Sequence, residues 1–336
     1  MEKFFVLSRQ QSLFLKGIAI IFVLLGHAEY IYKSGCWGVN LFMIISGYGI
    51  FASFRKNKLK NYFSNKIKKV YLPYFLVAII FIIYYIFNNR TFFSKKVIFT
   101  TLVGLDLNYN FDKTMWYISY IFLQYFIFYF FAFFACFLIK NQKVRDYLIL
   151  LFTFLINIFI YQIFDFLFPN VLIWNSGAGV FLYKYSFSIG LFLFLLSDIS
   201  IKKILKNNIY KLLIFFSFAA LICLYNNVGI STIRYAIYVH LMPIIILSFM
   251  QLDIVNCNNK YIYFMGKYSY DIYLWEGFFL FSHNNWFSVF ELKIFNDIVT
   301  ILITISVAYF YRKIVIDSVN NFSFKKCNSF LFSSLL

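Results

Sequence analysis

The feature that most restricts how this chain can fold is a series of ten apolar stretches, each about as long as a membrane-crossing helix. A hydrocarbon layer of ~30 Å requires about 20 residues of α-helix, so each stretch predicts one transmembrane helix. The stretches lie near residues 12–30, 37–54, 71–87, 116–139, 147–168, 178–197, 210–226, 234–252, 262–282 and 296–316. The run Val97–Leu105 is too short to span and is expected to be re-entrant or interfacial.

The composition excludes a large soluble domain. Of the 336 residues, 62% are hydrophobic and only 13% are charged, which is too little polar surface for a water-soluble protein. No repeat, linker or low-complexity tract divides the chain. We therefore expect an all-α integral membrane protein with about ten transmembrane helices, in which residues 1–336 form one polytopic domain.

The net charge of +18 suggests a nucleic-acid partner until the positions of the basic residues are considered. With the N-terminus in the cytoplasm, 23 of the 31 Lys and Arg residues fall on the cytoplasmic side of the ten helices. This distribution follows the positive-inside rule, so topology explains the basic residues. The sequence predicts cytoplasmic N- and C-termini, contacts with membrane lipids and no nucleic-acid partner.

The first stretch differs from a secretory signal peptide. Lys16 lies within its start and no small-residue cleavage site follows, which indicates an uncleaved first helix. The five cysteines are scattered, without a CxxC pair or metal-ligand spacing. Neither a disulfide framework nor a metal site is expected.

Ionisable residues inside a membrane helix are costly and are functional candidates by default. Lys16 and His27 lie eleven residues apart, close to three helical turns, so their side chains point to roughly the same face. A cation is thereby placed near the cytoplasmic boundary and an imidazole about 16 Å further along the helix. The alternative is a snorkelling lysine and a histidine hydrogen-bonded to a neighbouring helix.

The next segments carry small residues and a basic loop. Gly38–Phe42 (GVNLF) and Ile45–Tyr48 (ISGY) belong to the second stretch, where small residues allow a neighbouring helix to approach closely. The loop Asn61–Tyr74 (NYFSNKIKKVYLPY) follows, and its Pro73 is expected to open the third helix, where a missing N–H costs nothing. A further block, Gly266–Trp275 (GKYSYDIYLW), lies late in the chain.

Taken together, these blocks resemble the acyltransferase 3 family of integral membrane O-acyltransferases. Lys16 and His27 match that family's Arg or Lys, ten residues, then His, and Gly38–Tyr48 matches its G-V-x-L-F-F-x-x-S-G-Y/F. The loop matches R-x-x-R followed by P-x-Y, with Lys66 and Lys69 in place of the arginines.

The chain departs from the family pattern at two places. Glu276 stands where the late block usually ends in His. Some relatives carry a Glu shortly after the tryptophan matched by Trp116, whereas Ile121, Phe122 and Gln124 follow here. Both departures concern candidate site residues other than His27, and His27 itself still matches the family pattern.

The resemblance implies an enzyme that moves an acyl group, commonly acetyl, from cytoplasmic acyl-coenzyme A to a sugar hydroxyl of a cell-surface or lipid-linked glycan. Acyl-coenzyme A would be the donor substrate, with no bound cofactor. The resemblance also implies a multi-pass location in the bacterial cytoplasmic (inner) membrane.

This chemistry requires a base near the acceptor hydroxyl, and an imidazole with an ordinary pKa of ~6.5 suits that role, so His27 is the expected general base. Glu29 is a weaker orienting candidate, because residues two apart on a helix do not face each other. Asp271 and Glu276 are expected to hold the imidazole or to bind sugar hydroxyls. An interhelical hydrogen bond or an interfacial position is the alternative for both.

The phosphates of coenzyme A require a cytoplasmic cationic site. The candidates are Lys16, Lys66 and Lys69, with Arg55 and Lys68 after them; alternatively, the loop lysines only set topology or contact lipid headgroups. His240 lies six residues after Arg234 and either lines the acceptor cavity or is a packed, hydrogen-bonded histidine.

A transporter or flippase of glycans or acylated intermediates is the competing function. It predicts charges spread over several helices and corresponding broken segments in two halves, whereas this sequence has few embedded charges and no repeat. The membrane-bound O-acyltransferases also use an embedded histidine, but late in the chain. Turnover of acyl-coenzyme A separates an acyltransferase from a flippase.

Overall fold

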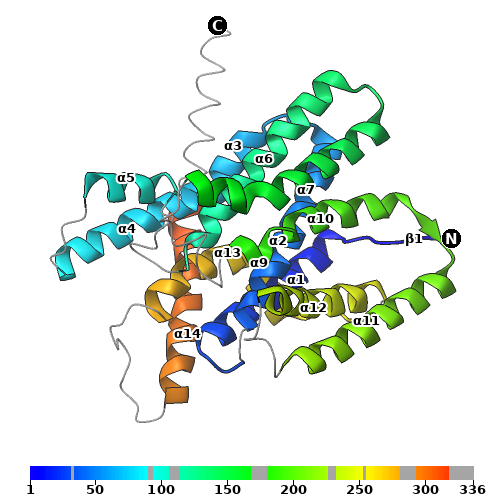
Figure 1. Ribbon diagram of the computed structural model, residues 1–336. Coiled ribbons are helices and arrows are strands. Elements are labelled where there is room, and N and C mark those ends of the chain that lie inside the picture. Colours follow the sequence, from blue (N-terminus) through cyan, green and yellow to red (C-terminus); the bar gives the residue numbers. More distant parts are fainter. Residues whose placement is uncertain are drawn as a thin grey trace, which may run out of the picture. The chain divides into compact units, whose positions relative to one another are not determined.

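The computed structural model describes residues 1–31, 34–89, 94–105, 114–167, 180–225, 232–252, 255–280 and 293–317, and these are almost entirely helical (Figure 1). The longer α-helices are α1 (Arg9–His27), α2 (Ser34–Asn57), α4 (Leu72–Asn89), α6 (Trp116–Leu138), α7 (Gln142–Leu167), α10 (Ser186–Leu195), α11 (Lys203–Tyr225), α12 (Thr232–Gln251), α13 (Lys260–Leu280) and α14 (Lys293–Phe310). The shorter elements are α3 (Tyr62–Lys66), α5 (Lys95–Leu102), α9 (Val180–Tyr183), the π-helical η1 (Ile67–Tyr71) and η3 (Tyr311–Ile316), and the 3-10 turn η2 (Leu196–Asp198). Each of the ten apolar stretches contains helix, as predicted.

Seven helices in the described part of the chain are long and apolar enough to cross a membrane. They are Arg9–His27, Ser34–Asn57, Tyr62–Phe87, Trp116–Leu138, Lys203–Leu224, Arg234–Gln251 and Lys293–Ile316. On α6 the side chains of Phe126 and Phe137 are 59% and 83% exposed, which suits contact with lipid and not with water. The chain is a multi-pass membrane protein; ten crossings and cytoplasmic termini stay predictions.

The described residues divide into two compact units. The first unit contains residues 1–60 and 116–267, from β1 to the first part of α13. The second unit contains residues 61–105, 114–115 and 268–317, with α3, η1, α4, α5, the rest of α13, α14 and η3.

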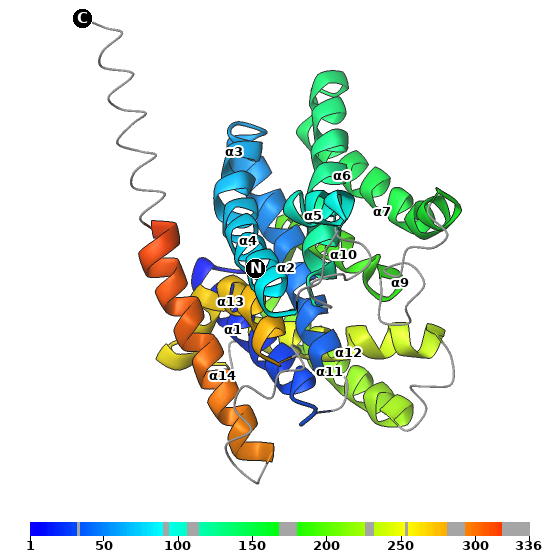
Figure 2. The ribbon, with the colours of Figure 1, turned by 90° about the vertical axis from the view of Figure 1, so that its left-hand side faces the viewer.

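In the first unit, α1, α10 and α12 pack against α2 (Figures 1 and 2). Glycines make this packing close. A Cβ added at Gly38 would collide with the carbonyl oxygen of Ala19 on α1, and one at Gly47 with that of Phe187 on α10. The prediction that small residues of the second stretch admit a neighbouring helix is confirmed.

Helix α1 begins and ends with recognisable signals. Ser8 and Gln11 form a capping box at its start, where the Ser8 hydroxyl accepts from the Gln11 N–H. The helix ends at His27, earlier than the predicted residue 30, because Gly26 lies against Gly35 in a tight α1–α2 connection. Glu29 lies beyond the helix, exposed and with φ of 64°, so its predicted place in the first helix is wrong.

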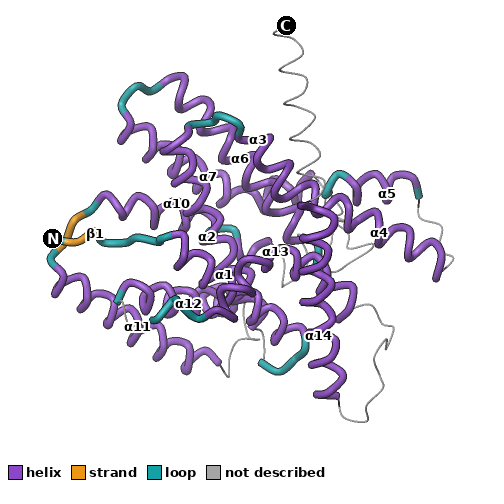
Figure 3. Tube along the Cα trace, turned by 180° about the vertical axis from the view of Figure 1, so that it is seen from behind, coloured by secondary structure: helices purple, strands orange, loops and turns teal. Residues whose placement is uncertain are grey.

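The N-terminus is fastened inside the first unit. Strand β1 (Glu2–Lys3) pairs antiparallel with β2 (Ser200–Ile201), drawn in orange in Figure 3. Lys206 reaches the Glu2 carboxylate at 3.4 Å, and the Tyr210 hydroxyl donates to the carbonyl of Phe4. These contacts join the segment before α1 to the start of α11.

In the second unit, helical structure begins at Tyr62, earlier than predicted. The π-helical turn η1 directly precedes Pro73, and the N–H of Leu72 donates to the carbonyl of Ile67 five residues back. Because proline lacks an N–H and its ring crowds the carbonyl four residues earlier, a wider turn lets the helix continue through it. Pro73 therefore lies within a helical run and does not open it.

Candidate active site

His27 is the last residue of α1 and is half-buried. Its ring lies against the start of α2, where a Cβ added at Gly35 would be 3.7 Å from both Nε2 and Cδ2. Glycine at this position brings backbone close to the imidazole. The C-terminal end of a helix carries partial negative charge, which favours the protonated imidazolium that a general base becomes.

Lys16 lies on the same helix, half-buried, and the unbroken helix from Arg9 to His27 confirms that the two side chains share a face. The residue after it, Gly17, meets the carbonyl of Ile262, and Gly266 meets the carbonyl of Leu13. Lys16 is therefore next to the point where α1 crosses the first part of α13.

Arg55, near the end of α2, is held by two carboxylates. Its Nε donates to Asp146 Oδ2 at 2.8 Å, and its two terminal nitrogens donate to both oxygens of Asp198 at 2.6 and 2.7 Å. Asp146 is fully buried and also lies 3.6 Å from Nε of Arg145. This cluster joins the ends of α2, α7 and η2, so the contacts of Arg55 in the structure are interhelical.

Two predicted phosphate ligands lie at the start of the second unit. Lys66 ends α3, and its Nζ is 5.8 Å from the ring centroid of Tyr62. Lys69 lies in η1 and is exposed, as is Lys68. Lys66 directly precedes the π-helical turn and Lys69 lies within it, so both lysines belong to the helical run that continues into α4.

The two predicted carboxylates lie on the part of α13 that belongs to the second unit. Asp271 is fully buried and accepts a hydrogen bond from Nε of Arg312 at 2.8 Å, which makes an interhelical ion pair with η3. Glu276, five residues later, is also fully buried. The interhelical alternative for Asp271 is thus present in the structure, and Arg312 is a partner that the sequence did not indicate.

Around these carboxylates, tyrosine hydroxyls bind backbone carbonyls. Tyr270 donates to the carbonyl of Val70 at 2.8 Å, Tyr311 to that of Pro73 at 2.6 Å, and Tyr273 to that of Thr114. Within the second unit, the Tyr270 and Tyr273 bonds connect the late block of α13 to η1 and to Thr114, and the Tyr311 bond connects η3 to the start of α4.

The structure gives His240 a partner that the sequence analysis missed. In the first unit, His240 Nε2 on α12 lies 3.2 Å from the hydroxyl oxygen of Ser186, the first residue of α10. Its Nδ1 lies 2.7 Å from the carbonyl oxygen of Ala236. His240 is thus hydrogen-bonded through both ring nitrogens.

A family model described as an acyltransferase domain matches residues 14–312 of the chain. The chain belongs to this acyltransferase 3 family. Membership implies acyltransferase activity and confirms the resemblance drawn from the motifs. No curated protein and no solved structure matches this acyltransferase.

The acyltransferase also has a buried polar network at the position of one departure from the family pattern. Gln124 and Asn157 exchange two hydrogen bonds, at 2.7 and 3.1 Å, and Asn157 donates to the Ser188 hydroxyl at 3.2 Å. Asn157 could have been found as a polar residue inside an apolar stretch. Ser186 could not, because only its spatial partner His240 distinguishes it.

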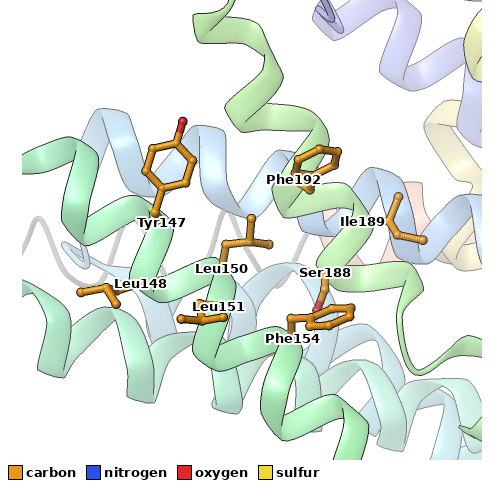
Figure 4. Close-up of a pocket in the computed structure, with 8 residues that line it drawn as sticks. All are labelled: Tyr147, Leu148, Leu150, Leu151, Phe154, Ser188, Ile189 and Phe192. Atoms are coloured by element: carbon orange, nitrogen blue, oxygen red, sulfur yellow. The ribbon is translucent and has the colours of Figure 1, made fainter.

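A groove of about 540 Å³ lies between α7 and α10 of the acyltransferase (Figure 4). Leu150, Leu151 and Phe154 line it from α7, and Ile189 and Phe192 from α10. Several of these side chains are exposed on the helix faces that suit contact with lipid. The groove offers no ionisable side chain except the Tyr147 phenol at its edge, so it contributes no candidate catalytic group.

Proposed function

We propose that the protein transfers an acyl group, commonly acetyl, from cytoplasmic acyl-coenzyme A to a sugar hydroxyl of a cell-surface or lipid-linked glycan. The observation that carries this proposal is the placement of Lys16 and His27 on one face of α1, in a chain of the acyltransferase family. A bacterial cytoplasmic membrane is the proposed location.

His27 acts as the general base in this proposal. Its imidazole takes the proton of the acceptor hydroxyl while the hydroxyl oxygen attacks the acyl carbonyl. The bond between the carbonyl carbon and its leaving group then breaks, and the leaving group departs with a proton. Placement at the C-terminal end of α1 supports this role, because the helix end stabilises the imidazolium that forms.

Lys16, Lys66 and Lys69 are the proposed partners of the donor phosphates. Lys69 is exposed and Lys66 is half-buried, so both ammonium groups are accessible to an anion. Arg55 is the least suitable of the residues predicted to bind the coenzyme A phosphates, because Asp146 and Asp198 already bind its guanidinium. Asp271 and Glu276 are proposed as embedded carboxylates that bind sugar hydroxyls, and Arg312 donates a hydrogen bond to Asp271.

Thioester turnover in membrane vesicles tests the reaction class. Vesicles that contain wild-type protein should release coenzyme A thiol from acetyl-coenzyme A and transfer the acetyl group to glycan acceptor. His27→Ala should lose at least about 100-fold in rate, whereas the matched surface variant Lys203→Ala should keep it. Glycan translocation without any thioester turnover by the wild type would instead establish the flippase alternative.

A further inference from the structure

We propose that a groove between α11 and α12 binds one anionic phospholipid of the cytoplasmic leaflet, with its phosphate at Lys211 and an acyl chain along α11. This inference is independent of the proposed acyl transfer. Its evidence lies wholly within the first unit, in the two helices and the N-terminal segment that contacts both.

The groove has a volume of about 490 Å³ and lies between the neighbouring helices α11 and α12 (Figures 1 and 3). Helix α11 contributes most of its lining, including Lys211, Phe215, Phe218 and Ile222. These four residues are three or four positions apart, so their side chains form one stripe along the helix. Residues near the end of α12 complete the lining. The groove is therefore an apolar stripe with a cation at one end.

The length of this stripe matches one leaflet of a bilayer. From Lys211 to Ile222 the helix rises about 16 Å, which is about half of the ~30 Å hydrocarbon layer. Phe215 and Ile222 are 65% and 59% exposed, on a helix long and apolar enough to cross a membrane. The positive-inside rule places the start of α11, and with it Lys211, toward the cytoplasm. One acyl chain of that leaflet would cover the apolar stripe.

Polar side chains continue the stripe toward the cytoplasmic end of α11. Asn207 and Asn208 precede Lys211 by four and three residues, so they lie on the same face of the helix. Asn208 is exposed and Asn207 is half-buried. Side chains on a helix lean toward its N-terminus, which brings the Lys211 side chain toward these amides. The face thus presents amides, then a cation, then apolar groups, in the order that complements a phospholipid from headgroup to chain.

Lys211 differs from the other lysines of α11 in its lack of an anion. Lys203 and Lys206 lie 3.6 and 3.4 Å from the carboxylate oxygens of Glu2. Lys211 is exposed and makes no ion pair among the described residues, although it lies about 12 Å further along the span than Lys203. A cation at that depth is costly unless it is paired or reaches the interface. The phosphate of an anionic lipid supplies the missing charge.

The N-terminal segment holds the cationic end of the groove in place. Tyr210, the residue before the cation, donates to the carbonyl of Phe4 at 2.7 Å. Gln251, the last residue of α12, exchanges two hydrogen bonds with the backbone of Val6, at 3.1 and 2.9 Å. Because Phe4 and Val6 are two residues apart, these bonds keep the cation level with the end of α12, where Leu252 lines the groove. A site fixed in this way loses little freedom when a headgroup binds.

The groove between α7 and α10 offers a comparison within the same unit. It has a similar volume, about 540 Å³, but its lining contains no lysine or arginine. A lipid chain can cover that groove whatever its headgroup. A preference for an anionic headgroup is therefore expected at the α11–α12 groove and depends on Lys211.

Native mass spectrometry of the whole chain in detergent tests the headgroup preference, with dioleoylphosphatidylglycerol as the anionic lipid and dioleoylphosphatidylcholine as the zwitterionic one. We expect the wild type to bind its first phosphatidylglycerol about 5-fold more tightly than its first phosphatidylcholine, the effect of one lysine near an anionic headgroup. Lys211→Met should remove this preference, and Lys211→Arg should keep it. Lys202→Met, which removes an exposed lysine just before α11 and outside the groove, should bind both lipids as the wild type does.

A second pair of variants tests the groove itself. Ala219 lines the groove and is exposed, so Ala219→Phe fills the space without crowding the protein interior. It should remove the tight phosphatidylglycerol binding event. Leu212→Phe, at another exposed position of α11 outside the lining, should leave that event unchanged. Melting temperatures equal to that of the wild type show that the variants are folded.

Two results would overturn the lipid site. If Lys211→Met keeps the wild-type preference, or if Ala219→Phe binds phosphatidylglycerol as tightly as the wild type, the groove is not where the lipid binds. If Ala219→Phe instead separates a dimer into single chains and leaves the lipid affinity unchanged, the groove binds a second copy of the chain. Neither result bears on the proposed acyl transfer, which is tested by thioester turnover.

Discussion

At the scale of single residues, buried partners determine which charges the protein tolerates inside its helices. Asp271 is fully buried, and its Oδ2 is bound by Arg312 while its Oδ1 has no hydrogen-bond partner among the described residues. Removing only the cation leaves the buried carboxylate uncompensated. This destabilises a protein more than replacing both partners with apolar residues. The pair therefore has an asymmetric response to substitution.

We expect Arg312→Met to lower the free energy of unfolding by about 1–3 kcal/mol, below the full cost for a buried pair because the Arg312 side chain is 23% exposed. The double variant Asp271→Leu/Arg312→Met should recover part of that loss, since no charge is left buried. Thermal unfolding in detergent measures both. Equal losses in the single and double variants would show that the ion pair does not compensate Asp271.

Asp198 gives a residue-scale pH dependence. It lies just beyond the α10 segment, and its hydrogen bonds from Arg55 lower the pKa of its carboxyl below the ordinary 3.8. Because the folded pKa is below the unfolded one, the pair stabilises the protein above that pH and loses its effect as pH falls through the folded value. Its contribution should therefore disappear only under acid conditions.

We expect Asp198→Asn to lower the melting temperature at pH 7 and to flatten its decline toward acid pH. Asp317→Asn is the matched control, since the side chain of that aspartate is 47% exposed and, among the described residues, has only a distant Lys313 partner at 3.9 Å. Melting curves from pH 7 downward test this. A slope for Asp198→Asn as steep as that of the wild type would contradict the assignment.

At the scale of elements, hydropathy predicted the helices well because a membrane helix is specified by its own sequence. The errors are at helix ends, because contacts with neighbouring segments determine where a helix begins and ends. The first helix stops at His27 because α1 and α2 meet through Gly26 and Gly35. The third helical run begins at Tyr62 because a π-helical turn accommodates Pro73.

The candidate site shows the same division. Lys16 and His27 were found from their spacing within one helix, a local property of the sequence. Ser186 was missed because the pattern of α10 contains nothing unusual at that position, and its significance comes from His240, 54 residues away. A hydrogen bond between distant segments has no signature in a single sequence.

The packing of α2 against α10 can be tested with two glycines of similar type. A Cβ at Gly190 would collide with the carbonyl of Ile44, whereas one at Gly49 would meet nothing within 4 Å. Gly190→Ala should destabilise the protein by about 1–3 kcal/mol through overpacking. Gly49→Ala should stabilise it by up to about 1 kcal/mol, because alanine favours helix. Thermal unfolding that ranks them in the opposite order would contradict the close α2–α10 contact.

At the scale of the whole molecule, the basic residues predict the orientation of the chain in the membrane. In a cysteine-free background, Glu29→Cys should react with a membrane-impermeant maleimide on intact spheroplasts. Lys140→Cys, after the end of α6, should react only after the membrane is opened. The reverse pattern of labelling would overturn the predicted cytoplasmic termini and with them the cytoplasmic place of Lys16.

The central claim for the whole molecule is that it acylates a glycan and that His27 is the base. NMR of cell-surface glycan from a deletion strain tests this claim, with complementation by wild type, His27→Ala or Lys16→Ala at equal membrane abundance. We predict that the wild type restores the O-acetyl signals, that His27→Ala does not, and that Lys16→Ala restores them only partly. Full restoration by His27→Ala would contradict the mechanism, and unchanged acylation with loss of glycan from the surface of the deletion strain would contradict the acyltransferase itself.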